Sequence, residues 1–430
     1  MSVVGKQNTT HYDEVFARAN AVTQTGFPTI NVARSNTGSY TDIRANSNTD
    51  ILYIRGTGVT LTTNTNTKTL AITTTSDLRV SQNSALLATN NWTTRTSAND
   101  TFTWAGVVWS PELGLFASVT STGIGANGFK AMTSLDGFTW SLQATPVNNV
   151  FRRVSWAPEL GLFVAVSSTG SLDRIMTSSN GVTWTARTTL DNQFYDVAWS
   201  KELRLLVAVS TVGTSGNNHI ATSSDGITWT NRTSPANNEW LGVTWSPQLG
   251  IFAAVARTGE VAGSMVMTSS DGINWTLRTS PTTNAWNKVA WSPKLGLFAA
   301  VAANGATDRV MTSLDGINWT TQNTSASLIT WTDITWVPQF EAFVAVGNNV
   351  TGETARVMIS FDGITWTNQQ DPSAGRWQAI TWSPELGILV ASSASPSGNK
   401  IMTSKKMGVS RTIEARQTWA QVGSPLSIGF

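Results

Sequence analysis

The segment Trp109-Ser110-Pro111-Glu112-Leu113-Gly114-Leu115-Phe116 recurs along the chain with small changes. Further copies begin at Trp156, Trp199, Trp245, Trp291, Trp336 and Trp382, which makes seven copies at intervals of 43 to 47 residues. Self-similarity with a period of about 40 to 50 residues is typical of a propeller or a solenoid. The chain of 430 residues is therefore expected to be built from repeated supersecondary units.

A second motif, Ser-x-Asp-Gly-x-x-Trp, follows each of the first six copies, with Asn180 in place of Asp in the second. These motifs end at Trp140, Trp184, Trp229, Trp275, Trp319 and Trp366. The seventh copy is split between the two ends of the repeat region, because Ile401–Ser404 matches its first half and Trp92–Ser97 matches the strand that would follow it. This division predicts a closed ring in which the strand at Trp92 pairs with the strand at Met402. An open solenoid would instead need polar capping repeats.

Each repeat has the pattern of four strands. The second strand, for example Leu297–Val301, is apolar at successive positions, so both of its faces must be covered. Neighbouring blades of a propeller provide that cover, and radial repetition leaves only short, protected edges. We therefore predict an all-β fold, with a seven-bladed β-propeller over residues 86–404, a small β-rich module over 1–85 and a C-terminal extension over 405–430.

The aspartate of the second motif is expected to shape a hairpin turn. A short acidic side chain accepts hydrogen bonds from its own turn, and the following glycine adopts positive φ. Catalysis or metal binding by these residues is the alternative, but identical positions around a ring lie far apart, whereas paired catalytic carboxyls need about 5 to 10 Å. We expect no catalytic residues, no metal site and no cofactor. The predicted structural residues are Asp136, Asn180, Asp225, Asp271, Asp315 and Asp362.

These motifs resemble the Asp-box, or bacterial neuraminidase repeat, family of propellers, over roughly residues 88–404. The family includes sialidases, which use an arginine triad, an acidic residue and a tyrosine nucleophile paired with a glutamate. The repeats here contain one tyrosine, Tyr195, and no glutamate that a motif assigns to it. The histidines His11 and His219 lack metal-ligand spacing. We predict that the protein is not an enzyme, with glycan cleavage as the alternative.

An aromatic residue lies five positions before each tryptophan of the first motif. These candidate ligand-binding residues are Trp104, Phe151, Phe194, Trp240, Trp286, Trp331 and Trp377. Exposed aromatic rings among hydroxyl and amide groups suit sugars, whereas the alternative is that they wedge between blades. The nearby loops Ser121–Asn127, Arg257–Gly263 and Gly347–Glu353 differ from blade to blade, so Arg257 and Asn349 are also candidates.

The N-terminal 85 residues lack the repeat and are rich in Thr and Asn, with a predicted hairpin over Val59–Ile72. Their composition resembles the shaft and attachment segments of tailed-phage fibre proteins. This resemblance implies a docking module that binds other virion proteins, with homo-oligomers, trimers included, as the expected assembly. The few large apolar residues in this segment agree with a module that needs a partner.

Composition excludes other classes. The net charge is +2 without basic clusters, so no nucleic-acid binding is expected. No apolar run approaches about 18 residues, so no membrane insertion is expected. The leading hypothesis is a bacteriophage virion protein, a tail fibre or receptor-binding protein whose propeller binds a host-surface glycan. The alternatives are a capsid decoration or head fibre protein without a ligand, a glycan-cleaving enzyme, and a cellular scaffold.

Overall fold

The computed structural model describes residues 2–3, 59–64, 69–74, 91–122, 128–189, 191–213, 217–260, 263–324, 329–348, 355–372, 375–395 and 399–406. The residues from Asn91 to Lys406 belong to one compact unit, and the strands between Ser2 and Thr74 belong to another.

The larger unit contains seven four-stranded antiparallel sheets, which we number as blades 1 to 7. Blade 1 contains β5 (Trp104–Ser110), β6 (Leu115–Thr120), β7 (Phe129–Ser134) and β8 (Ser141–Ala144), and blade 2 contains β9 (Phe151–Ala157), β10 (Leu162–Ser167), β11 (Ile175–Ser178) and β12 (Thr185–Arg187). Blade 3 contains β13 (Phe194–Ser200), β14 (Leu205–Ser210), β15 (Ile220–Ser223) and β16 (Thr230–Arg232), and blade 4 contains β17 (Trp240–Ser246), β18 (Ile251–Ala256), β19 (Val266–Ser269) and β20 (Thr276–Arg278). Blade 5 contains β21 (Trp286–Ser292), β22 (Leu297–Ala302), β23 (Val310–Ser313) and β24 (Thr320–Gln322), and blade 6 contains β25 (Thr330–Val337), β26 (Ala342–Asn348), β27 (Val357–Ser360) and β28 (Thr367–Gln369). Blade 7 contains β29 (Trp377–Ser383), β30 (Ile388–Ser393), β31 (Ile401–Ser404) and β4 (Trp92–Arg95).

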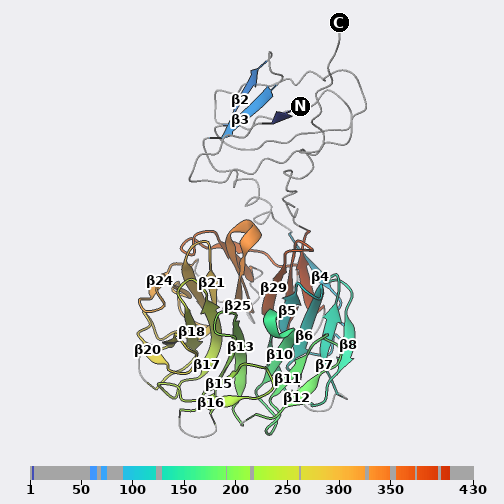
Figure 1. The fold of residues 1–430 in the computed structure, drawn as a ribbon, viewed down its shortest axis with the longest axis vertical. Coiled ribbons are helices and arrows are strands. Elements are labelled where there is room, and N and C mark those ends of the chain that lie inside the picture. Colours follow the sequence, from blue (N-terminus) through green and yellow to red (C-terminus); the bar gives the residue numbers. More distant parts are fainter. Residues whose placement is uncertain are drawn as a thin grey trace. The chain divides into compact units, whose positions relative to one another are not determined.

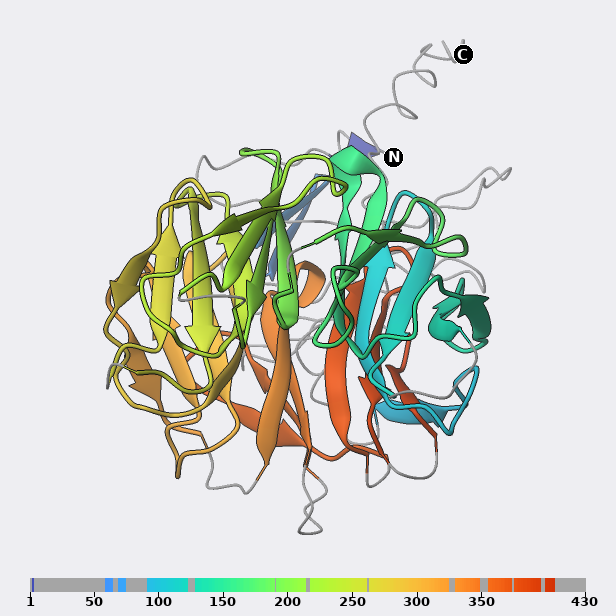
Figure 2. The same cartoon turned by 90° about the horizontal axis from the view of Figure 1, so that it is seen from below.

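The first strands of the blades form a closed ring. Each packs against the first strand of the blade before it and of the blade after it, and β5 of blade 1 contacts both β9 and β29. The blades stand around this ring (Figure 1, Figure 2). The chain is therefore an all-β, seven-bladed β-propeller, as the sequence predicts.

The ring is closed by strands from opposite ends of the repeat region. β4 pairs antiparallel with β31, with Met402 opposite Thr94 and Ser404 opposite Trp92. Just beyond, the amide of Lys405 donates to the carbonyl of Asn91 at 2.7 Å. The predicted pairing of the Trp92 strand with the Met402 strand is confirmed.

The second strands form the densest part of the core. Every residue of β22 is buried, as is every residue of β30. Apolar clusters run across blade boundaries, so that Phe116 and Trp140 of blade 1 share a cluster with Val390 and Ile401 of blade 7. The continuous apolar runs of these strands thus have cover on both faces, which is the property that predicted the propeller.

Two kinds of turn lie at one end of the blades. The Pro turns, such as 110–114, join first to second strands, and the Asp turns, such as 134–140, join third to fourth strands. Because the sheets are antiparallel, both lie on the same face, which we call the turn face. The opposite face, here the loop face, carries the connections from second to third strands and from blade to blade. Short 3-10 segments, Pro158–Leu160 (η1) and Pro338–Phe340 (η2), occur in two Pro turns.

The Pro turns also link consecutive blades, which the sequence does not predict. The indole of Trp156 in blade 2 donates to Glu112 Oε2 of blade 1 at 2.6 Å, and the indole of Trp291 donates to Gln248 Oε1 at 2.6 Å. Equivalent bonds join Trp109 to Glu385, Trp199 to Glu159, Trp245 to Glu202 and Trp382 to Gln339. Lys294 takes the acceptor position in blade 5 and instead pairs with Glu341 at 3.3 Å.

The smaller unit contains β1 (Ser2–Val3), β2 (Val59–Asn64) and β3 (Thr69–Thr74). β2 and β3 pair antiparallel, and β1 adds to β3 in parallel. The predicted roles of residues 1–85 and of 405–430 stay predictions, since most of the former and all of the latter beyond Lys406 lie outside the described residues.

Candidate functional site

The Asp turns make hydrogen bonds of the kind that the sequence predicts. In the blade 4 turn, Asp271 Oδ1 accepts hydrogen bonds from the amides of Ile273 and Asn274 at 2.8 and 2.7 Å and from Ser269 Oγ at 2.9 Å. The turn glycines have φ between 71° and 77°. A Cβ on Gly137 would lie 2.9 Å from Ile388 Cδ1 of the neighbouring blade, so the turn itself packs between blades.

The hydrogen bonds to the Asp turns lower the pKa of their carboxyls. Although burial opposes it, amide and side-chain donors bring the pKa of Asp271 and of Asp315 down to about 2. Asp136, Asp225 and Asp362 have lowered pKa values for the same reason. In blade 2, Asn180 Oδ1 accepts the same two amide bonds, at 2.9 and 2.8 Å, without a charge. These carboxyls are turn elements spread around the turn face.

The seven aromatic candidates are not exposed. Trp331 is 1% exposed, and the other six, Trp104, Phe151, Phe194, Trp240, Trp286 and Trp377, are 0% exposed. Each begins or nearly begins a first strand and packs between blades; Trp240 and Trp286, for example, lie in one apolar cluster that joins blades 4 and 5. Their faces are therefore not available to stack on a sugar, and the alternative interpretation, that they are wedges between blades, describes the structure.

A β-bulge follows the aromatic residue in every first strand, because the pairing register with the second strand shifts there. Bulges re-aim side chains and are common at barrel rims and near active sites. The bulged residues, which we call the bulge ring, differ in all seven blades. They are Ala105, Arg152, Tyr195, Leu241, Asn287, Thr332 and Gln378.

In four blades the residue directly after the bulged residue is charged. These side chains contact residues of other blades. Lys288 of blade 5 donates to Asp196 Oδ2 of blade 3, past blade 4, where the equivalent residue is Gly242. Arg153 of blade 2 reaches the carbonyl of Thr332 in blade 6 at 3.0 Å. We call Arg153, Asp196, Lys288 and Asp333 the axial cluster.

The two carboxylates of the axial cluster also join adjacent blades. Asp196 Oδ2 accepts the amide of Val243 at 2.9 Å, and Asp333 Oδ2 accepts the amide of Ile380 at 2.9 Å. Burial raises the pKa of Asp333, against the opposing charges of Arg153 and Lys288. Buried charges are costly unless they are paired and hydrogen-bonded, and a perturbed carboxyl among cations is a feature that functional sites share with structural ion networks.

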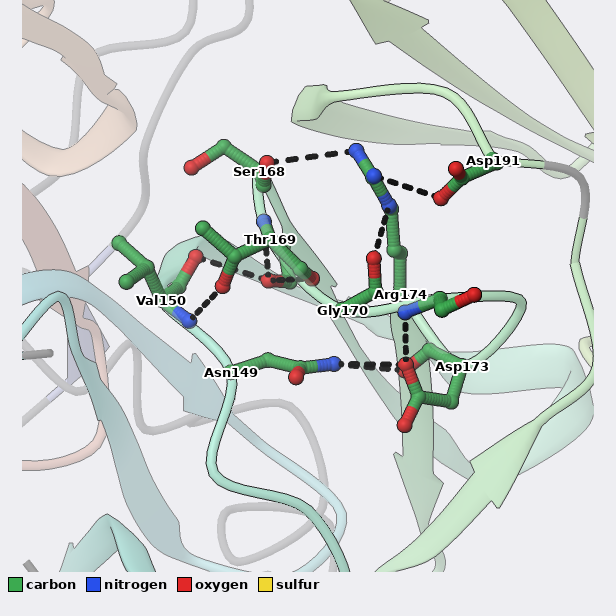
Figure 3. Close-up of polar contacts among 10 residues, drawn as sticks. Asn149, Val150, Ser168, Thr169, Gly170, Asp173, Arg174 and Asp191 are labelled. Carbon is green, nitrogen blue, oxygen red and sulfur yellow. Dashed lines mark hydrogen bonds and ion pairs between the residues drawn. The ribbon is translucent and has the colours of Figure 1, made fainter. Parts of the chain in front are cut away.

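A buried basic residue holds the loop-face connection in most blades. It stands immediately before or at the start of the third strand. The six residues are Lys130, Arg174, His219, Arg309, Arg356 and Lys400, and Met265 replaces them in blade 4. In blade 2, Arg174 donates to the carbonyls of Gly170 and Ser168 at 3.1 and 3.3 Å and pairs with Asp191 at 2.5 Å, while Asn149 donates to the carbonyl of Asp173 at 2.9 Å (Figure 3).

These loop clamps were missed by the sequence reasoning, although a signal was present. A basic residue precedes the apolar pair of the third strand in six of seven blades. In blade 6, Arg356 makes two bonds to Asp371, at 3.0 and 3.1 Å, and in blade 3 His219 Nε2 lies 2.6 Å from Asn237 Oδ1. The clamps fix the loop-face backbone by side chains buried beneath it.

Arg152 connects a clamp to the bulge ring. Its Nε donates to the hydroxyl of Ser168 at 2.9 Å, and the backbone carbonyl of Ser168 accepts from Arg174. The guanidinium carbon of Arg152 lies 5.1 Å from the ring centre of Tyr195 in blade 3. Both residues are half-buried. A chain of polar contacts thus runs from Asp191 through Arg174 and Ser168 to the Arg152–Tyr195 pair.

The remaining candidates lie apart from this pair or outside the described residues. Arg257 is in the blade 4 loop and forms an ion pair with Glu239 at 2.9 Å, with both side chains partly exposed. Asn349 lies outside the described residues, as does most of the loop around it. Within the described ranges, no group of three or more His, Asp or Glu side chains could hold a metal ion. The same residues include no helix with the length and apolar character to cross a bilayer.

Comparisons with known proteins agree on the fold. No family model matches the sequence, and no curated protein matches it. Among solved structures, a streptogramin B lyase has a TM-score of 0.59 at 11% identity, covering 73% of this chain and 96% of the lyase. The chain shares the propeller fold. A catalytically inactive virginiamycin B lyase from Staphylococcus aureus with quinupristin has a TM-score of 0.60 at 8% identity, covering 73% and 98%.

A mitotic checkpoint complex chain is also similar, with a TM-score of 0.52 at 16% identity, covering 73% of this chain and 91% of that one. At these identities the likeness shows architecture alone. The neighbours include enzymes and members of a protein assembly, so the comparison leaves the prediction that this protein is not an enzyme as a prediction.

Proposed function

We propose that the protein is a bacteriophage virion protein that displays a rigid propeller and binds a host-surface glycan through the loop face. The observation that carries this proposal is the broken symmetry of the bulge ring. Blade-packing positions repeat around the propeller, whereas the bulged residues are of a different type in every blade. Ala105, Leu241 and Thr332 are buried among them, and the half-buried ones, Arg152, Tyr195, Asn287 and Gln378, are all polar. Packing accounts for repeated residues, and recognition of an asymmetric ligand accounts for polar residues that differ and stay partly accessible.

The loop clamps support a binding role. Binding sites require residues held in place by surrounding hydrogen bonds. In blade 2 the clamp holds the backbone from Ser168 to Arg174 and, through Ser168, the side chain of Arg152. A prepositioned loop loses less conformational entropy when it binds.

The finer assignment rests on the sequence. The Asp turns have the hydrogen bonds expected of the Asp-box family, and we propose membership of that family on this basis. The Thr- and Asn-rich segment before the propeller supports a virion attachment module that docks on other virion proteins. A capsid decoration role without a ligand is the nearest alternative within the same class.

Two experiments test the proposal. Antibody labelling of purified phage particles should locate the protein on the particle surface, and its absence from particles would refute the virion assignment. Fluorescently labelled full-length protein should bind host cells, with binding lost when surface polysaccharide is removed. Binding that is unaffected by the removal would exclude a glycan receptor.

An enzyme is the second candidate function, and the axial cluster favours it. A carboxyl with a raised pKa beside a lysine and an arginine is a possible acid or base. Incubation of the protein with sialosides and with host polysaccharide tests this candidate. Release of products that is lost in Asp333→Asn, but not in Asp271→Asn, would establish it.

A further inference from the structure

We propose that Arg152 and Tyr195 form a binding site for a saccharide unit that carries one anionic group, a carboxylate or a phosphate. The inference deepens the proposed glycan-binding function and rests on it. Two features of Arg152 support it: contacts fix the guanidinium in place, and its terminal nitrogens remain available as donors.

The guanidinium of Arg152 is fixed in orientation on one side. Its Nε donates to Ser168 Oγ at 2.9 Å, and its guanidinium carbon lies over the ring of Tyr195, 5.1 Å from the ring centre. Ser168 is 8% exposed and is itself anchored, because its amide donates to the carbonyl of Val150 at 3.1 Å. Rotation of the arginine would break both contacts.

The terminal nitrogens of Arg152 are available. Neither Nη1 nor Nη2 has a hydrogen-bond or ion-pair partner among the described residues. The neighbouring Arg153 is different, since its terminal nitrogens donate to the carbonyls of Ala105 and Thr332 at 2.7 and 3.0 Å. Two parallel guanidinium donors match the oxygens of a carboxylate or a phosphate.

The local charges favour an anion. The axial cluster contains two cations and two carboxylates, which compensate one another formally, and the nearest acidic residue of the clamp, Asp191, is paired with Arg174. Arg152 is therefore an additional, uncompensated cation at the loop-face end of the first strands. A ligand with one anionic group would neutralise this cation.

Tyr195 defines the rest of the ligand. Its hydroxyl has no partner among the described residues, and the side chain is half-buried, so it offers a donor beside the guanidinium. Sugars combine hydroxyl groups with an apolar ring face, which an amphipathic aromatic side chain accommodates. The pair thus matches an anionic sugar better than a free inorganic anion.

The outer strands provide a matched control. Arg187 in β12 also donates from Nε to a hydroxyl, Thr177 Oγ1, at 2.7 Å, and it is also half-buried. It lies on the fourth strand of the same blade, away from the ring of first strands. Arg187→Gln therefore removes an arginine with the same kind of anchor but outside the proposed site.

The test uses full-length protein with glucose, glucuronate and glucose 6-phosphate as probes, and saturation-transfer NMR and titration as readouts. We expect glucuronate or glucose 6-phosphate to bind at least about tenfold more tightly than glucose, because each charge-assisted hydrogen bond contributes on that scale. The anion that binds more tightly identifies the source as a uronic acid or a sugar phosphate. Arg152→Gln should remove this preference, and Arg187→Gln should keep it.

Tyr195→Phe should weaken binding of the anionic sugar by about threefold while binding of inorganic phosphate stays unchanged. Unchanged thermal unfolding of each variant separates loss of the site from loss of the fold. Equal binding of all three sugars, or a preference that survives in Arg152→Gln, would overturn the inference. If the native protein shows no anion preference and host-cell binding persists in Arg152→Gln, this site alone is overturned, whereas absence of any glycan binding by the native protein would refute the proposed function as well.

Discussion

The turn face and the loop face of the propeller are made from the same repeat, but they differ in how closely the blades copy one another. On the turn face, six Asp turns repeat the same carboxylate or amide geometry, and six tryptophans donate to a glutamate or glutamine of the preceding blade. On the loop face, the bulge ring has seven different residues. The repeated contacts of the turn face hold the blades together, whereas we propose that the differing residues of the loop face bind a ligand.

The largest expected effect is on closure of the ring. Deletion of residues 91–97, which include β4, exposes the edge of β31 and removes the buried Trp92. Loss of one buried tryptophan alone costs about 3 to 5 kcal/mol, so we expect a large fall in melting temperature and loss of cooperative unfolding. Calorimetry measures both, and an unchanged transition would mean that β4 does not close the propeller.

The buried aromatic residues between the blades should contribute to stability and not to ligand binding. Trp240→Ala and Trp286→Ala should each lower the free energy of unfolding by about 3 to 5 kcal/mol, because both side chains are fully buried. Denaturant titration gives this value. Ligand affinity at a temperature where the variants stay folded should be unchanged, and a selective loss of affinity would restore these residues as binding candidates.

Two substitutions of Asp271 should separate the contribution of hydrogen bonding to stability from that of charge. Asp271→Ala should cost about 1 to 2 kcal/mol at pH 7, since the turn loses its acceptor for two amides and Ser269. Asp271→Asn should cost less, because Asn180 makes the same amide bonds in blade 2. Chemical denaturation of both variants beside the native protein tests this difference, and equal losses would contradict it.

The Asp turns should also make the stability of the protein depend on pH. The pKa of Asp271 is about 2 in the folded protein and near 3.8 without the fold, so the folded state favours the ionised form. Its contribution is present above about pH 4 and is lost as pH falls toward 2. Between pH 5 and pH 2, the free energy of unfolding should therefore fall less for Asp271→Asn than for the native protein. An identical pH dependence would show that the turn bonds do not depend on charge.

The smallest effect is expected at the bonds between Pro turns. Glu202→Ala should lower stability by less than about 1 kcal/mol, because the bond from Trp245 to Glu202 is exposed. Glu202→Gln should retain the bond, as Gln248 does for Trp291. A thermal shift assay of the two variants tests this order.

The sequence predicts the fold well because the features that define it repeat. Seven copies of one turn motif fix the number of blades, and the split seventh repeat fixes the closing pair of β4 and β31. The Asp turns follow from local chemistry, since Asp271 bonds to residues within three positions of itself. Each of these inferences needs only neighbouring residues or periodicity.

The candidate site is less predictable because its contacts connect distant residues. The aromatic residues are binding candidates in the sequence because exposed rings suit sugars, but Trp240 and Trp286 are fully buried and pack between blades. In the axial cluster, Lys288 and Asp196 are 92 positions apart, and Arg153 is 179 positions from Thr332, whose carbonyl it binds. No short motif encodes such contacts. Arg152 and Tyr195 meet across two neighbouring blades, at the bulge positions of their first strands.

The closing strand has a mechanical consequence. Asn91 and Lys405 lie side by side where the chain enters and leaves the propeller, with the β4 and β31 pairing directly beyond them. A pull that separates these two ends would open the strand pair from its end, one hydrogen bond after another. A pull on Asn91 against a ligand held at the loop face would instead slide β4 along β31, loading all of their hydrogen bonds at once. The propeller should resist the second kind of force far longer than the first.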